Sequence, residues 1–533
     1  MPDPVNTAAQ QAALSARRGV AGTGWRGALS VFGAAAAILW LAQRRRLGLY
    51  DEGIMLTGGW LVGQGQVPYR DFYYMYGPAP LYLIAAAFKL FGTSALTMRA
   101  LDCAIKAVLV VLLRRLGEVV AGPRGGWATA GLALVWMIGI ASYAYPVWTS
   151  ASLGAGAVLM LTRGNWRAEL YGGVLAGLSL IARYDLGFGG VAALGCVLAW
   201  KKAAEADHGP VRAALRGVLP FAAGCALVGV PLLGLSLALG LTHDLVDQLV
   251  VLQLRYYGEY RRLDWPGAAF SEDLVFYVPV LATALALAGG AAFSAERRGS
   301  RAAGRADWAV RFLCLLAMAF FMKSIVRKSA IHVAASLMIS LPLATACARR
   351  LVGHWRETGL AVKALAALGA VMLAVPSAII AVDAVVKSSA LPRRADEAVM
   401  EGLLVPADLR AAISTITART APDEPIFVAT SDNDRAFVND LSAYFLARRK
   451  PATRWYTYDA GLHASAPVQA AIIGDLERTG TRYVLLSRAY EGVREPNLSS
   501  VSSGVTLLDD YLAARFRVVG VYGVYSVLER VPS

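Results

Sequence analysis

The sequence predicts a polytopic α-helical membrane protein with a C-terminal α/β domain. The chain of 533 residues is 57% hydrophobic and has a mean hydropathy of +0.50, a composition that is common in membrane proteins and rare in soluble domains. Lys and Arg gather in every second loop between the apolar segments, which indicates an alternating path across a bilayer. From about residue 392, charged residues return and the apolar runs shorten.

About eleven membrane spans are expected, with the basic loops on the cytoplasmic side. Their approximate ranges are 28–42, 96–113, 127–142, 149–161, 170–182, 186–200, 218–241, 274–293, 308–322, 330–348 and 360–386. We expect a cytoplasmic tail over 1–27 and a membrane domain over 28–391, whose first outer loop is 43–95. An odd number of spans places the last part, 392–533, outside the cytoplasm.

Charge and cysteine usage narrow the functional classes. The net charge of +15 would suggest nucleic-acid binding in a soluble protein, but the basic residues lie between apolar spans and no nucleic-acid-binding module is visible. We therefore expect no nucleic-acid partner. The five cysteines stand singly in apolar segments, a pattern that indicates neither a metal site nor a disulfide framework.

The first outer loop carries the acids of greatest interest. Asp51 and Glu52 follow the first span directly, and Asp71 lies twenty positions later beside Arg70. The apolar run after Pro78 and Pro80 is too short to cross a bilayer, so we expect a helix lying at the membrane surface there. A carboxylate at such a surface can act as a general base.

Structural roles for the same acids remain open. Asp51 could instead be the N-cap of a surface helix over 52–62, where the helix dipole favours both Asp51 and Glu52. Asp71 could pair with Arg70 or cap a turn.

Two further clusters are expected at the outer face. The turn between the ninth and tenth spans holds Lys323, Arg327, Lys328 and His332, and such cations could stabilise a leaving phosphate. The alternatives are contact with lipid headgroups and, for His332, a helix-end hydrogen bond.

Arg183 and Asp185, at a hairpin tip, could bind a phosphate or a sugar hydroxyl, or form a structural ion pair. The rings and cations of 255–262 could stack on a sugar or form an interfacial aromatic belt.

One pattern resembles a known family. Asp51-Glu52-Gly53, then 65–72 (GQVPYRDF), Gly77-Pro78 and Phe91-Gly92, resemble the polytopic GT-C glycosyltransferases, above all protein O-mannosyltransferases and lipid A aminoarabinose transferases. The resemblance implies a polyprenyl-phosphate-sugar donor, a reaction on the non-cytoplasmic face and Asp51 as the catalytic base. It also implies surface helices over Glu52 to Gly63 and Ala79 to Phe91.

Two later features bear on the same resemblance. Arg327 with His332 resembles the Arg and nearby His of this family's late outer turn. The outer loop 143–148 lacks the second acid that these enzymes often carry, so Asp71 or Asp185 is left as a candidate for that role.

The C-terminal part predicts alternating strands and helices, which favours a small α/β domain. Strands are expected at 426–429 and 483–486, with a strand pair over 518–528. Helices are expected at 408–419, 439–448, 467–478 and 507–515.

These observations predict an inverting glycosyltransferase of a bacterial inner membrane. It would move a sugar from a polyprenyl-phosphate carrier to an acceptor hydroxyl on a glycan, lipid or protein. The chemistry demands no metal or cofactor, although a divalent ion on Asp51 is an open alternative. The rival interpretations are a transporter or flippase of lipid-linked saccharides, and an assembly or sensor protein whose outer domain binds a partner.

Overall fold

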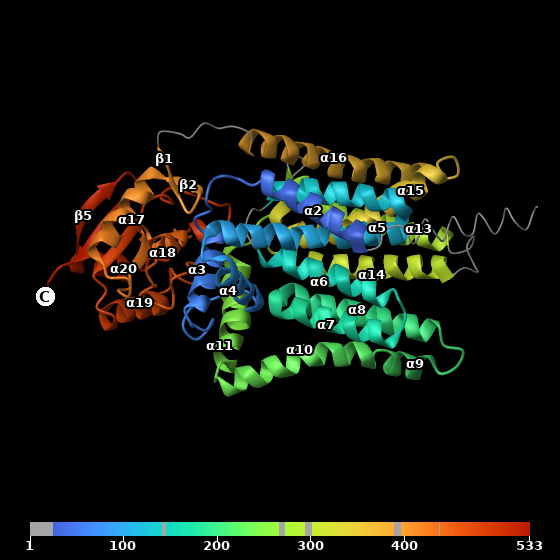
Figure 1. Ribbon diagram of the computed structural model, residues 1–533, viewed down its shortest axis with the longest axis horizontal. Coiled ribbons are helices and arrows are strands. Elements are labelled where there is room, and N and C mark those ends of the chain that lie inside the picture. Colours follow the sequence, from blue (N-terminus) through green and yellow to red (C-terminus); the bar gives the residue numbers. More distant parts are fainter. Residues whose placement is uncertain are drawn as a thin grey trace, which may run out of the picture.

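The computed structural model describes residues 25–140, 145–265, 272–293, 301–388, 396–435 and 438–532. Most of the predicted N-terminal tail (1–24) and the predicted domain boundary at 392 lie outside the described residues. Long helices run side by side along the longest axis, and the C-terminal region, 396–532, sits at one end of them (Figure 1).

The helical bundle is built from ten long helices among the described residues. They are α2 (Trp25–Leu41), α5 (Ala95–Ile140), α6 (Pro146–Leu161), α7 (Trp166–Ala182), α8 (Tyr184–Ala204), α10 (Leu219–Ala238), α13 (Val278–Phe293), α14 (Arg301–Ser324), α15 (Ala330–Gly353) and α16 (Leu360–Ser388). The short α9 (Pro210–Gly217) lies at the end away from the C-terminal region (Figure 1).

Length and composition suit several of these helices to a membrane. In the described part of the chain, four stretches are long and apolar enough to cross one, namely Tyr184–Ala204, Pro210–Ala238, Ala330–Gly353 and Leu360–Val382. The count of eleven spans stays a prediction.

The second and third predicted spans are the two arms of α5. Gly122 has a φ of 74° and stands before Pro123, so the helix breaks there and doubles back. Glycines allow the arms to touch: a Cβ added at Gly126 would stand 2.8 Å from the carbonyl oxygen of Arg114. Arg114 also covers the Trp127 ring, 4.2 Å from its centroid.

The segment 242–273, which connects the seventh and eighth predicted spans, is helical over 242–260. The chain forms α11 (Thr242–Val246), two π-helical stretches (Asp247–Val251 and Gln253–Tyr257) and α12 (Gly258–Tyr260). The apolar periodicity of this segment is interrupted, so the sequence did not predict a helix. The fully buried Gln248 side chain binds the first loop: it donates to the Tyr69 carbonyl (2.7 Å) and accepts from the Tyr74 backbone amide (3.1 Å).

Both surface helices of the first loop occur where the sequence placed them. They are α3 (Asp51–Gly63) and α4 (Ala79–Phe91), and they lie between the bundle and the C-terminal region (Figure 1). Asp51 is the first residue of α3 rather than its N-cap. That position belongs to Tyr50, whose side chain makes no capping hydrogen bond.

The C-terminal region combines a hairpin and a mixed sheet with helices. The hairpin is β1 (Glu397–Met400) and β2 (Leu403–Pro406), and the sheet has the order β3 (Phe427–Thr430), β4 (Tyr483–Ser487), β6 (Tyr525–Arg530), β5 (Phe516–Tyr522). Only the β3–β4 pair is parallel. The helices are α17 (Ala407–Arg419), α18 (Ser442–Ala447), α19 (Ala466–Arg478) and α20 (Leu507–Arg515), with short 3-10 turns at Asn433–Arg435 and Leu498–Ser500.

The first loop shares a hydrophobic core with the C-terminal region. Buried side chains of α3, such as Ile54 and Leu56, belong to one cluster with Tyr444 and Val484, while the bundle has a cluster of its own. Contact is close at Gly53, where an added Cβ would stand 2.5 Å from the Ser442 amide nitrogen. The sequence assigned this loop to the membrane domain, but its packing ties it to the C-terminal region.

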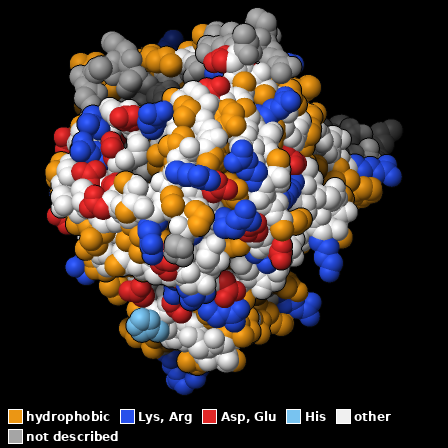
Figure 2. Space-filling model, turned by 90° about the vertical axis from the view of Figure 1, so that its left-hand side faces the viewer, with side chains coloured by type: hydrophobic (Ala, Val, Ile, Leu, Met, Phe, Trp, Pro, Cys, Tyr) orange, Lys and Arg blue, Asp and Glu red, His pale blue; other side chains and the backbone are white. Residues whose placement is uncertain are grey.

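The face of the C-terminal region that points away from the bundle has the appearance of a water-exposed surface. Figure 2 shows Lys and Arg side chains interspersed with Asp and Glu over this face. Such mixing of both signs is typical of soluble surfaces. An extracytoplasmic position for this region remains a prediction.

Candidate active site

A cavity of about 750 Å³ lies at the end of the bundle that adjoins the C-terminal region, within the range of ligand-binding pockets. The first loop, five segments of the bundle and the C-terminal region all contribute to its walls. Its polar and aromatic lining includes Tyr50, Asp51, Tyr76, Tyr145, Arg183, Tyr184, Asp185, Gln253, Tyr257, Arg261, Lys323, Arg327, His332 and Asp459. Six of the nine predicted site residues are therefore brought together: Asp51, Arg183, Asp185, Lys323, Arg327 and His332.

Asp51 lies at the start of α3, exposed and on the cavity wall. The amide groups at a helix N-terminus favour a negative charge, so this position supports an ionised carboxylate. The neighbouring Tyr50 is held in place, because its hydroxyl donates a hydrogen bond to the carbonyl of Tyr458. Burial raises the pKa of Tyr50 well above its usual value, which keeps that hydroxyl a donor.

Arg183 is a buried cation with an unused donor. It is 3% exposed, and its Nε donates to Asp185 Oδ1 at 2.9 Å. The guanidinium carbon lies 4.8 Å from the ring centroid of Tyr76 and 5.0 Å from that of Tyr145. Among the described residues, its buried Nη1 has no hydrogen-bond partner. Because an unmet buried donor is costly, this nitrogen is suited to receive an anion.

Lys323 and His332 face the same space from α14 and α15. The Lys323 ammonium makes no hydrogen bond or ion pair with any residue in the described ranges. His332 is fixed through Nδ1, which lies 2.7 Å from Ser329 Oγ. Lys323 thus adds a second cation with donors to spare.

The other two arginines of the cavity are paired with acids of the C-terminal region. Arg327 makes a bidentate contact with Glu495, with Nη1 to Oε2 at 3.0 Å and Nη2 to Oε1 at 2.5 Å. Arg261 Nε lies 3.5 Å from Asp459 Oδ1, which is a looser pair. Burial raises the pKa of Asp459, and the Arg261 guanidinium offsets only part of that shift.

Glu52, a predicted catalytic acid, points away from the cavity lining. It is 2% exposed and accepts from Arg99, with Oε1 2.7 Å from Nε and Oε2 2.9 Å from Nη2. Its Oε2 also accepts from the Gly48 amide at 2.7 Å. The adjacent carboxylates diverge because successive helix positions point about 100° apart. Glu52 therefore has a structural contact where a catalytic one was expected.

Asp71 and Lys328 also lie outside the cavity lining. Asp71 pairs with Arg70 (Oδ1 to Nε 2.8 Å) and accepts from the Val67 amide at 2.7 Å, and the Arg70 hydrogen bond lowers its pKa. Lys328 donates to the carbonyl of Leu263 at 2.9 Å. The structural alternative for Asp71 matches this geometry, and Lys328 is turned toward the 242–265 segment rather than toward the cavity.

Sequence reasoning missed part of the lining. Tyr257 and Arg261 belong to the stretch 255–262, whose rings and cations the sequence offered for sugar stacking or for an interfacial belt. Nothing in the sequence pointed to Asp459, which lies between a buried tyrosine and a small residue. Its arrival at the cavity depends on the fold of the C-terminal region.

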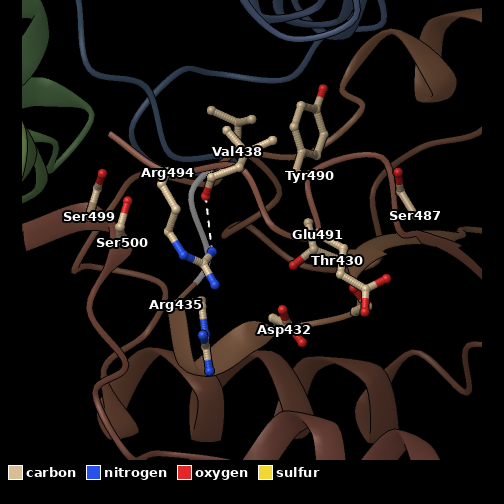
Figure 3. Close-up of a pocket in the computed structure, with 12 residues that line it drawn as sticks. Thr430, Asp432, Arg435, Val438, Ser487, Tyr490, Glu491, Arg494, Ser499 and Ser500 are labelled. Carbon is tan, nitrogen blue, oxygen red and sulfur yellow. Dashed lines mark hydrogen bonds between the residues drawn. The ribbon is translucent and has the colours of Figure 1, made fainter. Parts of the chain in front are cut away.

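Two observations bear on other sites. Among the described residues, no group of three or more His, Cys, Asp or Glu side chains could hold a metal ion. A separate pocket in the C-terminal region, lined by Thr430, Asp432, Arg435 and Arg494 among others (Figure 3), has a volume of only about 20 Å³. That volume is far below the range of sugar-sized ligand pockets.

Comparisons with known proteins identify the fold. No protein-family model and no curated protein matches the sequence. ArnT from Cupriavidus metallidurans bound to undecaprenyl phosphate aligns with a TM-score of 0.57 and 15% identity over 96% of this chain and 99% of ArnT. Its apo structure gives a TM-score of 0.56, also at 15% identity, over 96% and 98% of the two chains.

A second solved protein aligns less closely. The archaeal oligosaccharyltransferase AglB from Archaeoglobus fulgidus, in complex with an inhibitory peptide and a dolichol-phosphate, aligns with a TM-score of 0.50 and 13% identity over 87% of this chain and 70% of AglB. ArnT and AglB are both GT-C superfamily members. The predicted resemblance is therefore confirmed at the level of the fold: the chain shares the overall fold of ArnT and AglB.

Proposed function

We propose that the protein is an integral-membrane glycosyltransferase. It transfers a sugar from a polyprenyl-phosphate carrier to an acceptor hydroxyl on the extracytoplasmic face. The observation that carries this proposal is the shared cavity. Asp51, Arg183 and Lys323 line the same cavity, and both cations have N–H donors available for a ligand.

The cations suit the phosphate of the donor. Arg183 Nη1 and the Lys323 ammonium can each donate a charge-assisted hydrogen bond, which is stronger than a neutral one. Arg183 is buried, and buried charges interact more strongly than charges in bulk water. The undecaprenyl phosphate bound to ArnT makes a polyprenyl carrier the natural donor for a chain of the same fold.

Asp51 suits the role of general base. Its carboxylate takes the proton of an acceptor hydroxyl, whose oxygen then attacks the anomeric carbon of the sugar. The bond from that carbon to the phosphate oxygen breaks, and the lipid phosphate leaves with the bonding electrons. A single displacement inverts the configuration at the anomeric carbon. Arg183 and Lys323 stabilise the charge that develops on the phosphate.

Apolar side chains complete the cavity. Its non-polar lining includes Phe188, Leu249, Val250, Leu254, Met322 and Ile331. The first isoprene units of the carrier could pack against this wall while the phosphate reaches the cations. Asp185, which already accepts from Arg183, acts as a positioning residue for that arginine.

A transfer assay tests the proposal. Purified wild type and Asp51→Asn, in nanodiscs, receive radiolabelled undecaprenyl-phosphate hexoses and an extract of cell-envelope acceptors. We expect Asp51→Asn to lose about 100-fold or more of the rate, the usual contribution of a general base. Glu259→Gln removes an exposed acid outside the cavity lining and serves as the matched control.

Two outcomes would contradict the proposal. Undiminished transfer by folded Asp51→Asn would remove Asp51 from the chemistry. Movement of the labelled lipid across the bilayer of wild-type proteoliposomes without any sugar transfer would favour a transporter.

A further inference from the structure

The Arg327–Glu495 pair raises a question that the proposed function leaves open. A guanidinium that binds a phosphate bidentately does so with the same pair of terminal nitrogens that binds a carboxylate. In this structure both terminal nitrogens of Arg327 are occupied by Glu495, at 3.0 and 2.5 Å. Arg327 lines the cavity, yet its strongest binding edge is already taken.

Glu495 reaches Arg327 from a long loop, residues 488–506, between β4 and α20. The middle of this loop, 491–501, is mostly exposed. Among the described residues, its only hydrogen bonds to the rest of the chain are the two from Arg327. Within the loop, the side-chain amide of Asn497 donates to Glu495 Oε2 at 2.9 Å, and the backbone N–H of Glu495 donates to Ser500 Oγ at 2.7 Å. The carboxylate is therefore preset by its own loop.

The loop is anchored at its ends rather than at its middle. At one end the Arg488 amide donates to the Val524 carbonyl at 2.8 Å, and at the other the Ser503 amide donates to the Asp434 carbonyl at 2.8 Å. Gly492 and Gly504 adopt positive φ angles of 76° and 73°, conformations that few other residues adopt easily. A segment with fixed ends and few contacts between them can move at low cost.

A small pocket of about 20 Å³ lies beside the loop. Figure 3 shows Arg494, Ser499 and Ser500 beside the small pocket described above, and the one interaction drawn there is local, from Arg494 Nη1 to the Val493 carbonyl at 3.1 Å.

The charges around the cavity also favour an exchange of Glu495 for a phosphate. Four cations (Arg183, Arg261, Lys323, Arg327) and three carboxylates (Asp51, Asp185, Asp459) line the cavity. Glu495, which lies just outside the lining, adds a fourth carboxylate, so the site is balanced when the loop is closed. A phosphodiester, the linkage of a polyprenyl-phosphate sugar, carries one negative charge and can replace Glu495 charge for charge.

We infer that Glu495 is a carboxylate latch that competes with the phosphate of the lipid donor for Arg327. The inference rests on the proposed function. In the latched state Arg183 and Lys323 alone are ready for the phosphate. Donor binding draws Arg327 away from Glu495, and the 488–506 loop is released. Glu495 thereby sets the affinity of the site and couples its occupancy to the C-terminal region.

A binding experiment tests the latch without knowledge of the sugar. Undecaprenyl phosphate is titrated onto full-length wild type, Glu495→Gln, Arg327→Gln and the double variant in nanodiscs. If the unlatched form makes up about one tenth of the wild-type protein, wild type binds about 10-fold more weakly than a protein that is always unlatched. We therefore expect Glu495→Gln to bind undecaprenyl phosphate about 10-fold more tightly than wild type. Glu491→Gln, a change of the same charge in the same loop, should bind like wild type.

Two further readouts sharpen the test. The gain from Glu495→Gln should vanish in the Arg327→Gln background, since the two residues act as one unit. Hydrogen exchange of the 488–506 backbone should speed up when wild type binds undecaprenyl phosphate, and should already be fast in Glu495→Gln.

The outcomes separate the two proposals. Equal or weaker binding by Glu495→Gln, with wild-type binding intact, would overturn the latch and leave the proposed function standing. It would show that Glu495 merely holds Arg327 in place. No binding of undecaprenyl phosphate by any folded variant would overturn the proposed function, and the latch with it.

Discussion

The two ends of the helical bundle hold their charges in different ways. At the end away from the C-terminal region, the ion pairs stay within the bundle: Arg114 and Arg115 contact Glu118, Lys202 contacts Glu169 and Arg350 contacts Asp307. At the cavity end, Arg261 and Arg327 instead pair with Asp459 and Glu495 of the C-terminal region. Pairs of the first kind hold the bundle helices together, whereas pairs of the second kind join the bundle to the C-terminal region at the site.

The largest effect is expected where a distant pair is purely structural. Glu52→Gln leaves Arg99, 1% exposed, without its buried counter-charge, and breaking such a pair costs about 3–5 kcal/mol. We expect a marked loss of thermal stability in detergent, measured by a melting assay. The local partner Glu118, which is 18% exposed, should cost less when it is changed to Gln. Equal losses for the two variants would erase the distinction between the two ends.

Arg183→Gln should give the next effect, measured on donor binding by the folded variant. The variant removes a charge-assisted contact to the donor phosphate, worth about 1.5–3 kcal/mol, so undecaprenyl phosphate should bind about 10- to 100-fold more weakly. Isothermal titration in nanodiscs measures this. Arg115→Gln removes a basic residue at the opposite end and should bind like wild type. Weakening by both variants to the same degree would indicate general attraction to anionic lipid.

Asp71→Asn should have a small effect. The Arg70–Asp71 pair is partly exposed, at 49% and 28%, and such pairs contribute about 0–1 kcal/mol. We expect a slight drop in melting temperature and an unchanged transfer rate. A large loss of transfer by a folded Asp71→Asn protein would return this acid to the catalytic group from which its geometry removes it.

The latch should show no pH dependence near neutrality. Burial alone would raise the pKa of Glu495, but hydrogen bonds from Arg327 and Asn497 outweigh burial and hold the pKa below its usual value. The stabilisation from a depressed carboxyl pKa is present above the ordinary value, about 4.3, and is lost only as the pH falls through the lowered one. The ratio of wild-type to Glu495→Gln affinity should therefore stay constant from about pH 5 to pH 8. A ratio that changed within this window would point to another titrating group.

Much of the fold could be predicted from the sequence because its signals are local. The bounds of α3 and α4 follow from short apolar runs, and the strand pair β5–β6 follows from alternation around the glycine at 523. The helix over 242–260 was missed, because packing against the first loop outweighs its weak periodicity. The shared core of α3 and the C-terminal region had no sequence signal either, since contacts such as Gly53 with Ser442 join positions far apart.

The candidate site divides in the same way. Sidedness, inferred from the basic loops, was enough to suggest that Asp51 and the cations near residue 323 share the outer face. The sequence could not predict which of the two adjacent acids points into the cavity. Asp51 lines the cavity, whereas Glu52 pairs with Arg99. Glu495 and Asp459 come from the C-terminal region, and only the tertiary fold brings them to Arg327 and Arg261.

The most direct test of the central claim is an electron cryo-microscopy structure of the protein with undecaprenyl phosphate in nanodiscs. The account predicts phosphate density beside Arg183 and Lys323, on the side of the cavity that faces Asp51, with Arg327 turned away from Glu495. Phosphate density at the opposite end of the bundle, or a lipid headgroup bound outside the cavity while Arg183 Nη1 stays without a partner, would contradict it.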